Sequence, residues 1–141
     1  MSFSRFIIAS LAAAVFGAGA AAAEDKPSIR LELNNLEDLS AGCRFTFVSA
    51  NSAGHDIEKA AFEVAFFNAD GLVDKLTTLN FGQLQDGRTV VRQFEIPGSK
   101  CDGYSRVLIN AVKSCDGFPG GVDACEAALA TANKSKIEFG A

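Results

Sequence analysis

Four cysteines carry the clearest chemistry in this sequence: Cys43, Cys101, Cys115 and Cys125. No two of them are spaced as Cys-x-x-Cys, the pattern of thioredoxin-like redox sites and of many zinc sites. An even number of cysteines in an exported chain is typical of disulfides, so we expect two bridges. Four cysteines allow three connectivities, and their spacing alone leaves all three open.

The only histidine is His55, so any catalytic triad and any histidine-based metal site would need it. It follows Gly54 and precedes Asp56 in a turn-rich loop, and the chain contains no Gly-x-Ser-x-Gly elbow. This setting is typical of a solvated loop histidine. With Met1 the only methionine, a copper carrier also lacks ligands. We therefore expect no catalytic residue, no metal and no cofactor, and the sequence predicts a protein that is not an enzyme.

The acidic residues occur in pairs that lack the spacing of a calcium-binding loop. The pairs are Glu37 with Asp38, Asp70 with Asp74, and Asp116 with Asp123. None matches D-x-D-x-D-G, so a solvated surface is the favoured interpretation. The glycines are scattered in turns, and none forms a phosphate-binding loop before a helix. The triplet Asn133-Lys134-Ser135 matches a glycosylation site, a pattern that is common by chance.

Residues 1–23 have the pattern of an export signal. A positive head at Arg5 is followed by the apolar run Phe6–Phe16 and by Ala21-x-Ala23, which fits a signal-peptidase site. The apolar run is shorter than the roughly 20 residues that span a bilayer, so cleavage after Ala23 is favoured over an N-terminal membrane anchor. No twin arginine is present, which favours the general secretory route. We expect a secreted or periplasmic protein, with residues 24–141 as a single domain.

The charge of the chain narrows the class of partner. The formal net charge is −4 at pH 7, and no basic run is present. Nucleic acid and anionic membrane surfaces are therefore poor partners. No stretch after the signal is apolar enough to span a bilayer, so we expect no membrane insertion after cleavage. A protein partner is the expectation that remains, and the oligomeric state stays open.

A hairpin over Ala60–Phe81 organises the predicted fold. Phe62, Val64 and Phe66 alternate with residues of the opposite face, and the turn Asn68–Gly71 follows them. Seven segments are strand candidates: Ser28–Asn34, Cys43–Ala50, Ala60–Phe67, Leu72–Phe81, Arg88–Ile96, Tyr104–Lys113 and Lys136–Phe139.

Two further segments are predicted to lie outside the strands. Asn35–Gly42 is predicted to be a polar connection with one helical turn, and Val122–Ala132 a short helix near the C-terminus. Short strands separated by turn signals predict an all-β fold, a seven-stranded antiparallel sandwich with a phenylalanine core.

The order of these features resembles a known family. A Phe-rich strand leads into Asn68-Ala69-Asp70-Gly71, and Leu84-x-x-Gly87 precedes a strand that ends in Phe94-x-Ile96-Pro97. This order is similar to the FxLyD-type exported bacterial β-sandwich domains, over about Leu31–Ile96. Phe67-Asn68 stands where a tyrosine and an aspartate are usual, and the cysteines are additions. The resemblance implies an immunoglobulin-like fold and an accessory role, and it carries over no catalytic residue.

The resemblance also implies a disulfide pairing. In the seven-stranded order that it implies, the second and sixth strands run the same way, so Cys43 and Cys101 lie at neighbouring strand ends. Cys115 and Cys125 then close an excursion at the other end. The implied bonds are Cys43–Cys101 and Cys115–Cys125, against two other connectivities.

The candidate partner-binding residues lie in two loops and on one strand. Loops gather at the ends of a sandwich, and Asn51–Glu58 and Asp116–Ala124 are the least regular stretches. Phe118 and Pro119 lie between glycines, where an aromatic ring would either bind a partner or close the end of the core. His55 belongs to the first loop. Phe67 lies opposite in parity to the core positions of its strand.

The sequence thus predicts a non-enzymatic, secreted or periplasmic accessory or interaction module that binds a protein or an envelope component. The alternative is an inhibitor of an extracellular or periplasmic hydrolase, which would use the loop Gly117–Gly121.

Overall fold

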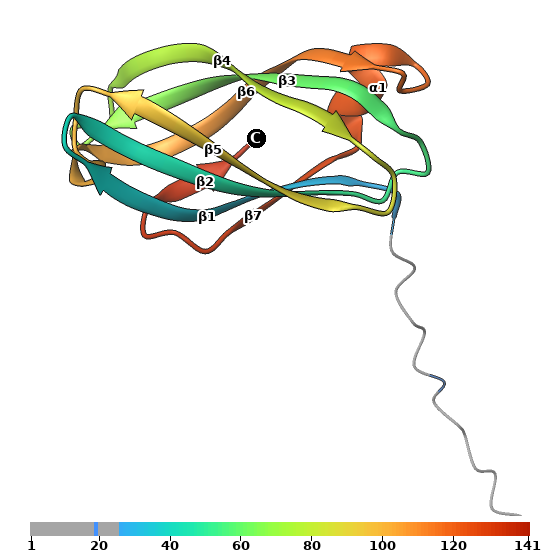
Figure 1. The fold of residues 1–141 in the computed structure, drawn as a ribbon, viewed down its shortest axis with the longest axis horizontal. Helices are drawn as coiled ribbons and strands as arrows, with labels where there is room; N and C mark the ends of the chain where they lie inside the picture. Colours follow the sequence, from blue (N-terminus) through green and yellow to red (C-terminus); the bar gives the residue numbers. More distant parts are fainter. Residues whose placement is uncertain (1–18, 20–25) are drawn as a thin grey trace, which may run out of the picture.

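The computed structural model describes Gly19 and residues 26–141. The expected signal peptide and its cleavage after Ala23 lie outside the described residues, so both stay predictions. The described chain forms two four-stranded β-sheets packed face to face, with one short helix near the C-terminus (Figure 1). The all-β sandwich is therefore confirmed. No helix in the described part has both the length and the apolar character needed to cross a membrane.

Each sheet draws its strands from along the whole chain. One sheet has the order β5-β2-β1-β7 and the other β4-β3-β6-β8. Their bounds are β1 Ile29–Leu39, β2 Gly42–Asn51, β3 Ile57–Asn68, β4 Val73–Leu84, β5 Thr89–Pro97, β6 Tyr104–Asp116, β7 Leu129–Asn133 and β8 Glu138–Gly140. A 3₁₀ turn, η1 (Cys101–Gly103), precedes β6, and the helix α1 (Gly121–Ala127) follows it.

The predicted strand number was wrong, whereas the predicted antiparallel pairing holds for four of the six strand pairs of the described residues. The described residues form eight strands, and β7 runs parallel to β1 while β8 runs parallel to β6. The predicted helix Val122–Ala132 splits into α1 and β7. Pairing of the Leu129–Asn133 backbone with Ile29–Leu33 outweighs the helix preference of its alanines.

The predicted polar connection Asn35–Gly42 was also wrong. The strand β1 continues past a bulge between Leu33 and Asn35, and it stays paired with β2 as far as Leu39. The extra residue of the bulge shifts the side-chain alternation, so a sequence pattern of period two is lost at this point.

Phenylalanine fills the space between the sheets. The fully buried aromatic side chains are Phe45, Phe47, Phe62, Phe66 and Phe81. Rings from opposite sheets meet edge to face, with centroids 4.9 Å apart for Phe45 and Phe66 and 5.5 Å apart for Phe47 and Phe81. Such pairs each stabilise by about 0.5–1.5 kcal/mol beyond the burial of their area. The expected inward face of the hairpin is therefore correct.

Two basic side chains bridge the unpaired edges of β4 and β5. Arg92 on β5 donates from Nε to the Phe81 carbonyl at 2.7 Å and from Nη2 to the Gln83 carbonyl at 3.3 Å. Lys75 on β4 donates to the Pro97 carbonyl at 3.2 Å. A free edge carbonyl can pair with the strand of another chain, so these bonds protect parts of this side of the sandwich from association.

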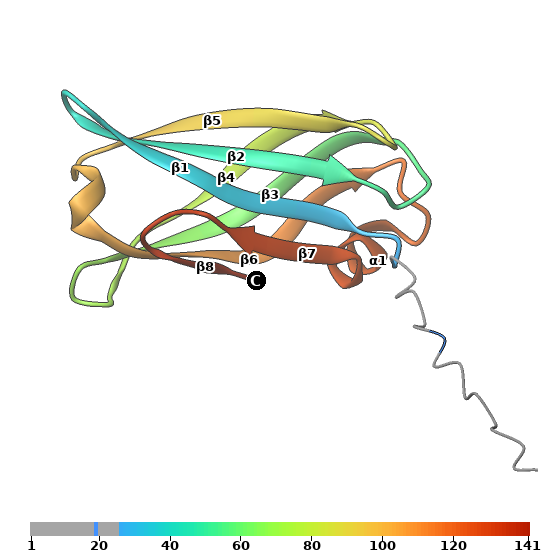
Figure 2. The same ribbon diagram turned by 90° about the horizontal axis from the view of Figure 1, so that it is seen from below.

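The turns gather at two opposite ends of the sandwich (Figure 2). We call the end with α1 the loop end; it also holds residues 52–56 and 85–88. We call the other the hairpin end; it holds the β3–β4 turn at residues 69–72, the segment 98–103 with η1, and the segment 134–137 between β7 and β8. The predicted binding residues are therefore divided between the two ends of the sandwich.

Candidate binding surfaces

The four cysteines form two disulfides, Cys43–Cys101 and Cys115–Cys125. This is the connectivity that the resemblance implied. The first bond joins β2 to η1 at the hairpin end, and the second joins β6 to α1 at the loop end. No described cysteine is free, so none is available as a thiol for redox or metal chemistry.

The loop end brings three of the predicted binding residues together. The rings of His55 and Phe118 lie edge to face with centroids 6.3 Å apart, and Pro119 is the next residue. His55 and Pro119 are exposed, whereas Phe118 is half-buried and packs against the core. Phe118 therefore largely closes the end of the core, the second of the two roles that the sequence allowed.

Asn51 holds the loops of this end in place. Its side chain is buried, and its Nδ2 donates to the carbonyls of His55 and Leu84, both at 2.8 Å. Its Oδ1 accepts the Ala53 amide at 3.0 Å. Asp86 connects the β4–β5 turn to the loop at residues 52–56, because its Oδ1 accepts a hydrogen bond from the Gly54 amide at 2.9 Å. The loops of this end are therefore tied to one another by hydrogen bonds.

Phe67 lies at the hairpin end, on the outer surface of the sheet formed by β4, β3, β6 and β8. Phe67 is paired across the strands with Val73 on β4 and with Arg106 on β6. Ala65, two residues earlier, is paired with Leu76 and Leu108. Paired residues share one side of a sheet. We call the outward-facing set Ala65, Phe67, Val73, Leu76 and Leu108 the hairpin face.

The hairpin face exposes more large apolar side chains than any other part of the described chain. Exposed fractions are 57% for Val73, 56% for Leu76 and 64% for Leu72 in the adjoining turn. The two other exposed large apolar residues, Val91 and Val122, lie on β5 and α1, away from this face. A concentration of this kind is typical of an interaction site.

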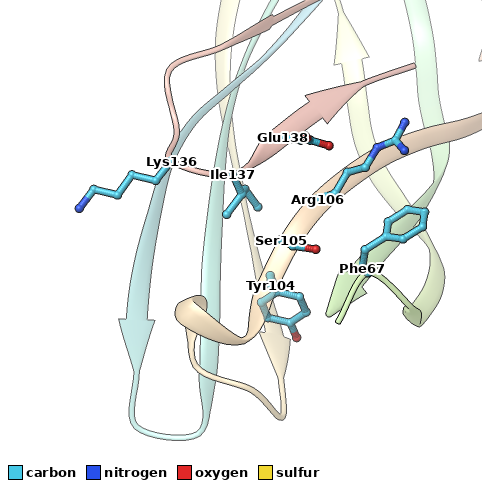
Figure 3. A pocket seen from close by; sticks show the side chains of 8 residues that line it. Phe67, Tyr104, Ser105, Arg106, Lys136, Ile137 and Glu138 are labelled. Carbon is cyan, nitrogen blue, oxygen red and sulfur yellow. The ribbon is translucent and has the colours of Figure 1, made fainter. Parts of the chain in front are cut away.

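A hollow of about 540 Å³ adjoins the hairpin face, open to solvent (Figure 3). Phe67, Ile137, Tyr104 and Arg106 contribute to its lining. The guanidinium carbon of Arg106 lies 5.3 Å from the centre of the Phe67 ring, which is a cation–π contact. The side chain of Lys136 points away from the hollow in this view.

Tyr104 lines both this hollow and a second one of about 480 Å³, as do Lys136 and Ile137. Its ring packs on Phe45 and Phe66, and its buried hydroxyl has no hydrogen-bond partner among the described residues. Burial raises the pKa of Tyr104, and the charge of Asp74 adds to this. The Tyr104 hydroxyl therefore stays protonated at neutral pH.

Glu32 holds the segment 134–137, which contributes to the lining of both hollows. Its carboxylate, 5% exposed, accepts bonds from Asn34 at 2.9 Å and Arg30 at 3.0 Å and lies 3.6 Å from the Lys134 ammonium. Next to Lys134, the Asn133 side chain bonds to the Ser135 amide and the Ile137 carbonyl. The residues of the glycosylation triplet thus shape this turn.

The pKa of Glu32 gives a pH-dependent prediction. The Asn34 hydrogen bond lowers this pKa below its ordinary value of 4.5, helped by Lys134 and Arg30 and opposed by burial. The carboxylate therefore stabilises the fold above pH 4.5, and this contribution is lost as the pH falls through the lower folded-state pKa. We expect the urea midpoint to fall less steeply below pH 4.5 in Glu32→Gln than in the wild type. The exposed Glu126→Gln is the control, and identical slopes in all three proteins would contradict the assignment.

Metal-binding geometry is not found among the acidic residues. No group of three or more His, Cys, Asp or Glu side chains in the described part is arranged to hold a metal ion. In comparisons with known proteins, no family model, curated protein or solved structure matches the chain.

The predicted binding residues did not include Leu72, Val73, Leu76 or Arg106. A signal was present for Leu76: it is three residues from Leu79, and residues three apart cannot share one side of a regular strand. Leu79 and Phe81 face the core, so Leu76 faces solvent.

Proposed function

We propose that this protein is a non-enzymatic interaction module, secreted or periplasmic, that binds a protein through the hairpin face. The observation that supports this most is the exposure of Leu72, Val73 and Leu76 beside a hollow. Burial of exposed apolar area is the main favourable term in protein association, at roughly 25 cal/mol per Å². Two disulfides suit a protein that works outside the reducing cytosol.

An immunoglobulin-like fold is part of this proposal. The order β1-β2-β5 in one sheet and β4-β3-β6 in the other corresponds to strands A-B-E and C′-C-F of that fold. The parallel contact of β8 with β6 departs from the usual antiparallel last strand. The order of the other strands supports the relation.

The loop end supports the inhibitor alternative less well. An inhibitory loop should project so that it can enter an active site. Here the chain turns back on itself, with the Phe118 amide bonded to the Cys115 carbonyl at 3.3 Å and the Gly121 amide to the Phe118 carbonyl at 3.0 Å. Phe118 then packs against the core instead of reaching outward.

Two variants with equal exposure test the proposed surface. Leu76 and Val91 are both 56% exposed, and they lie on edge strands of opposite sheets. Immobilised wild type and each serine variant are incubated with envelope extract, and the captured proteins are quantified. We expect Leu76→Ser to reduce capture about tenfold, equal to about 1.4 kcal/mol, and Val91→Ser to leave it unchanged.

The captured species also separates the two functions. Equal losses in both serine variants, or no loss in either, would contradict binding through the hairpin face. Capture of one hydrolase, lost in Phe118→Ala but kept in Leu76→Ser, would favour the inhibitor. Thermal unfolding of each variant shows whether the fold is retained.

A further inference from the structure

Arg106 is the charge at the margin of the hairpin face that is best placed to select a partner. It is exposed, and it makes no ion pair within 4.0 Å in the described part of the chain, although Glu138 is its neighbour across β6 and β8. Its guanidinium carbon lies over the Phe67 ring, 5.3 Å from the ring centre. A guanidinium presents its N–H groups in the fork that matches a carboxylate.

The opposite margin of the hairpin face carries negative charge. Asp70 lies in the β3–β4 turn and Asp74 on β4, and both are exposed. Neither forms an ion pair among the described residues. Phe67 therefore lies between β6, which carries Arg106, and β4, which carries Asp74. A partner of uniform charge would be attracted at one margin and repelled at the other.

Resting on the proposed function, we propose that the hairpin face binds an extended protein segment with apolar side chains flanked by an acidic residue on one side and a basic residue on the other. The acidic side chain pairs with Arg106, and the basic one lies near Asp70 and Asp74. An apolar side chain of the segment packs beside Phe67, at the hollow of about 540 Å³. The hollow is open to solvent, so the segment can pass through without ending there.

Glu138 opposes the acidic residue of such a segment. Its carboxylate lines the same hollow as Arg106 and would weaken the attraction for a partner carboxylate. Glu138→Gln is therefore expected to strengthen binding of an acidic segment, a gain that damage to the fold would not produce.

The test uses synthetic peptides with both ends blocked, in which leucines lie between a glutamate and a lysine at varied spacings. A matched set has glutamine in place of glutamate. We expect the glutamate set to bind wild type about fivefold more tightly than the glutamine set, in line with a partly exposed charge-assisted bond. Arg106→Gln should remove this difference, and Arg88→Gln at the loop end should keep it. Fluorescence anisotropy measures all the affinities.

The outcomes separate this inference from the proposed function. Equal affinity of both peptide sets for wild type, no measurable binding of either, or a difference that survives Arg106→Gln would overturn the partner chemistry. The hairpin face itself is judged by Leu76→Ser. If Leu76→Ser binds both peptide sets as tightly as wild type does, the proposed function is contradicted. If Leu76→Ser no longer binds either set, the proposed function is supported, whether or not the glutamate set binds wild type more tightly than the glutamine set.

Discussion

Replacing Cys43 and Cys101 together by alanine is expected to lower the free energy of unfolding by about 4 kcal/mol, the largest effect of any change considered for this protein. The bond joins residues that are 58 positions apart, and a cross-link removes more freedom from the unfolded chain when the loop is long. Replacing Cys115 and Cys125, 10 positions apart, should cost about 3 kcal/mol. Urea unfolding of the oxidised proteins measures both.

The two bonds should also differ in their effect on binding. Cys101 begins η1, and its amide donates to Asp38 Oδ1 at 2.8 Å. Because η1 directly precedes β6, the Cys43–Cys101 disulfide positions the start of that strand, which carries Tyr104 and Arg106. Under conditions where both variants are folded, loss of Cys43–Cys101 should weaken partner capture more than loss of Cys115–Cys125. The reverse order would indicate that the loop end binds the partner.

Asn51→Asp is expected to destabilise the protein by roughly 3 kcal/mol although the two side chains have nearly the same shape. The buried amide donates to the carbonyls of His55 and Leu84, and a carboxylate would leave both without a donor and repel them. The loss should shrink at low pH, because a protonated carboxyl regains one O–H donor. Unfolding in urea at several pH values measures this.

Asn80→Asp provides the matched control. Asn80 is exposed, and its Oδ1 accepts the Gly82 amide at 2.9 Å, a bond that a carboxylate can also accept. We expect this change to alter the free energy of unfolding by less than about 0.5 kcal/mol. Equal losses for both variants would show that Asn51 does not organise the loop end through its two donated bonds.

Alternation predicted β2 and much of β3 well, because each lies between the core and solvent. In β2, for example, Phe45 and Phe47 are buried while Arg44 and Thr46 are not. The turn at Asn68–Gly71 was also predictable, since Gly71 has φ of 77° and Asn68 Oδ1 accepts the Asp70 and Leu72 amides.

The last strands could not be predicted from local pattern. Apart from Leu129, the strand β7 consists of small and polar residues, and its conformation depends on parallel pairing with residues of β1 that lie 100 positions earlier. The bulge in β1 likewise has no signal in the alternation. In both places, contacts distant in sequence decide the conformation.

The candidate site was predictable only in part. Phe67 was singled out by its parity, and it does lie on an outer surface. The sequence did not mark Arg106 as a binding residue, because its candidate role depends on its contact with the Phe67 ring on the neighbouring strand. His55 and Phe118 were predicted from irregular loops and do meet, but their contact closes the core.

A photo-crosslinking amino acid placed in turn at the positions of Leu76, Val91 and Pro119 tests most directly whether the hairpin face binds a partner. The three positions lie on the hairpin face, on the outer surface of β5 and at the loop end. Irradiation of cells that export each variant, followed by blotting for the protein, reveals covalent adducts. We expect one discrete adduct from position 76 and none from positions 91 and 119. A discrete adduct from position 119 with none from position 76 would contradict the proposed binding surface.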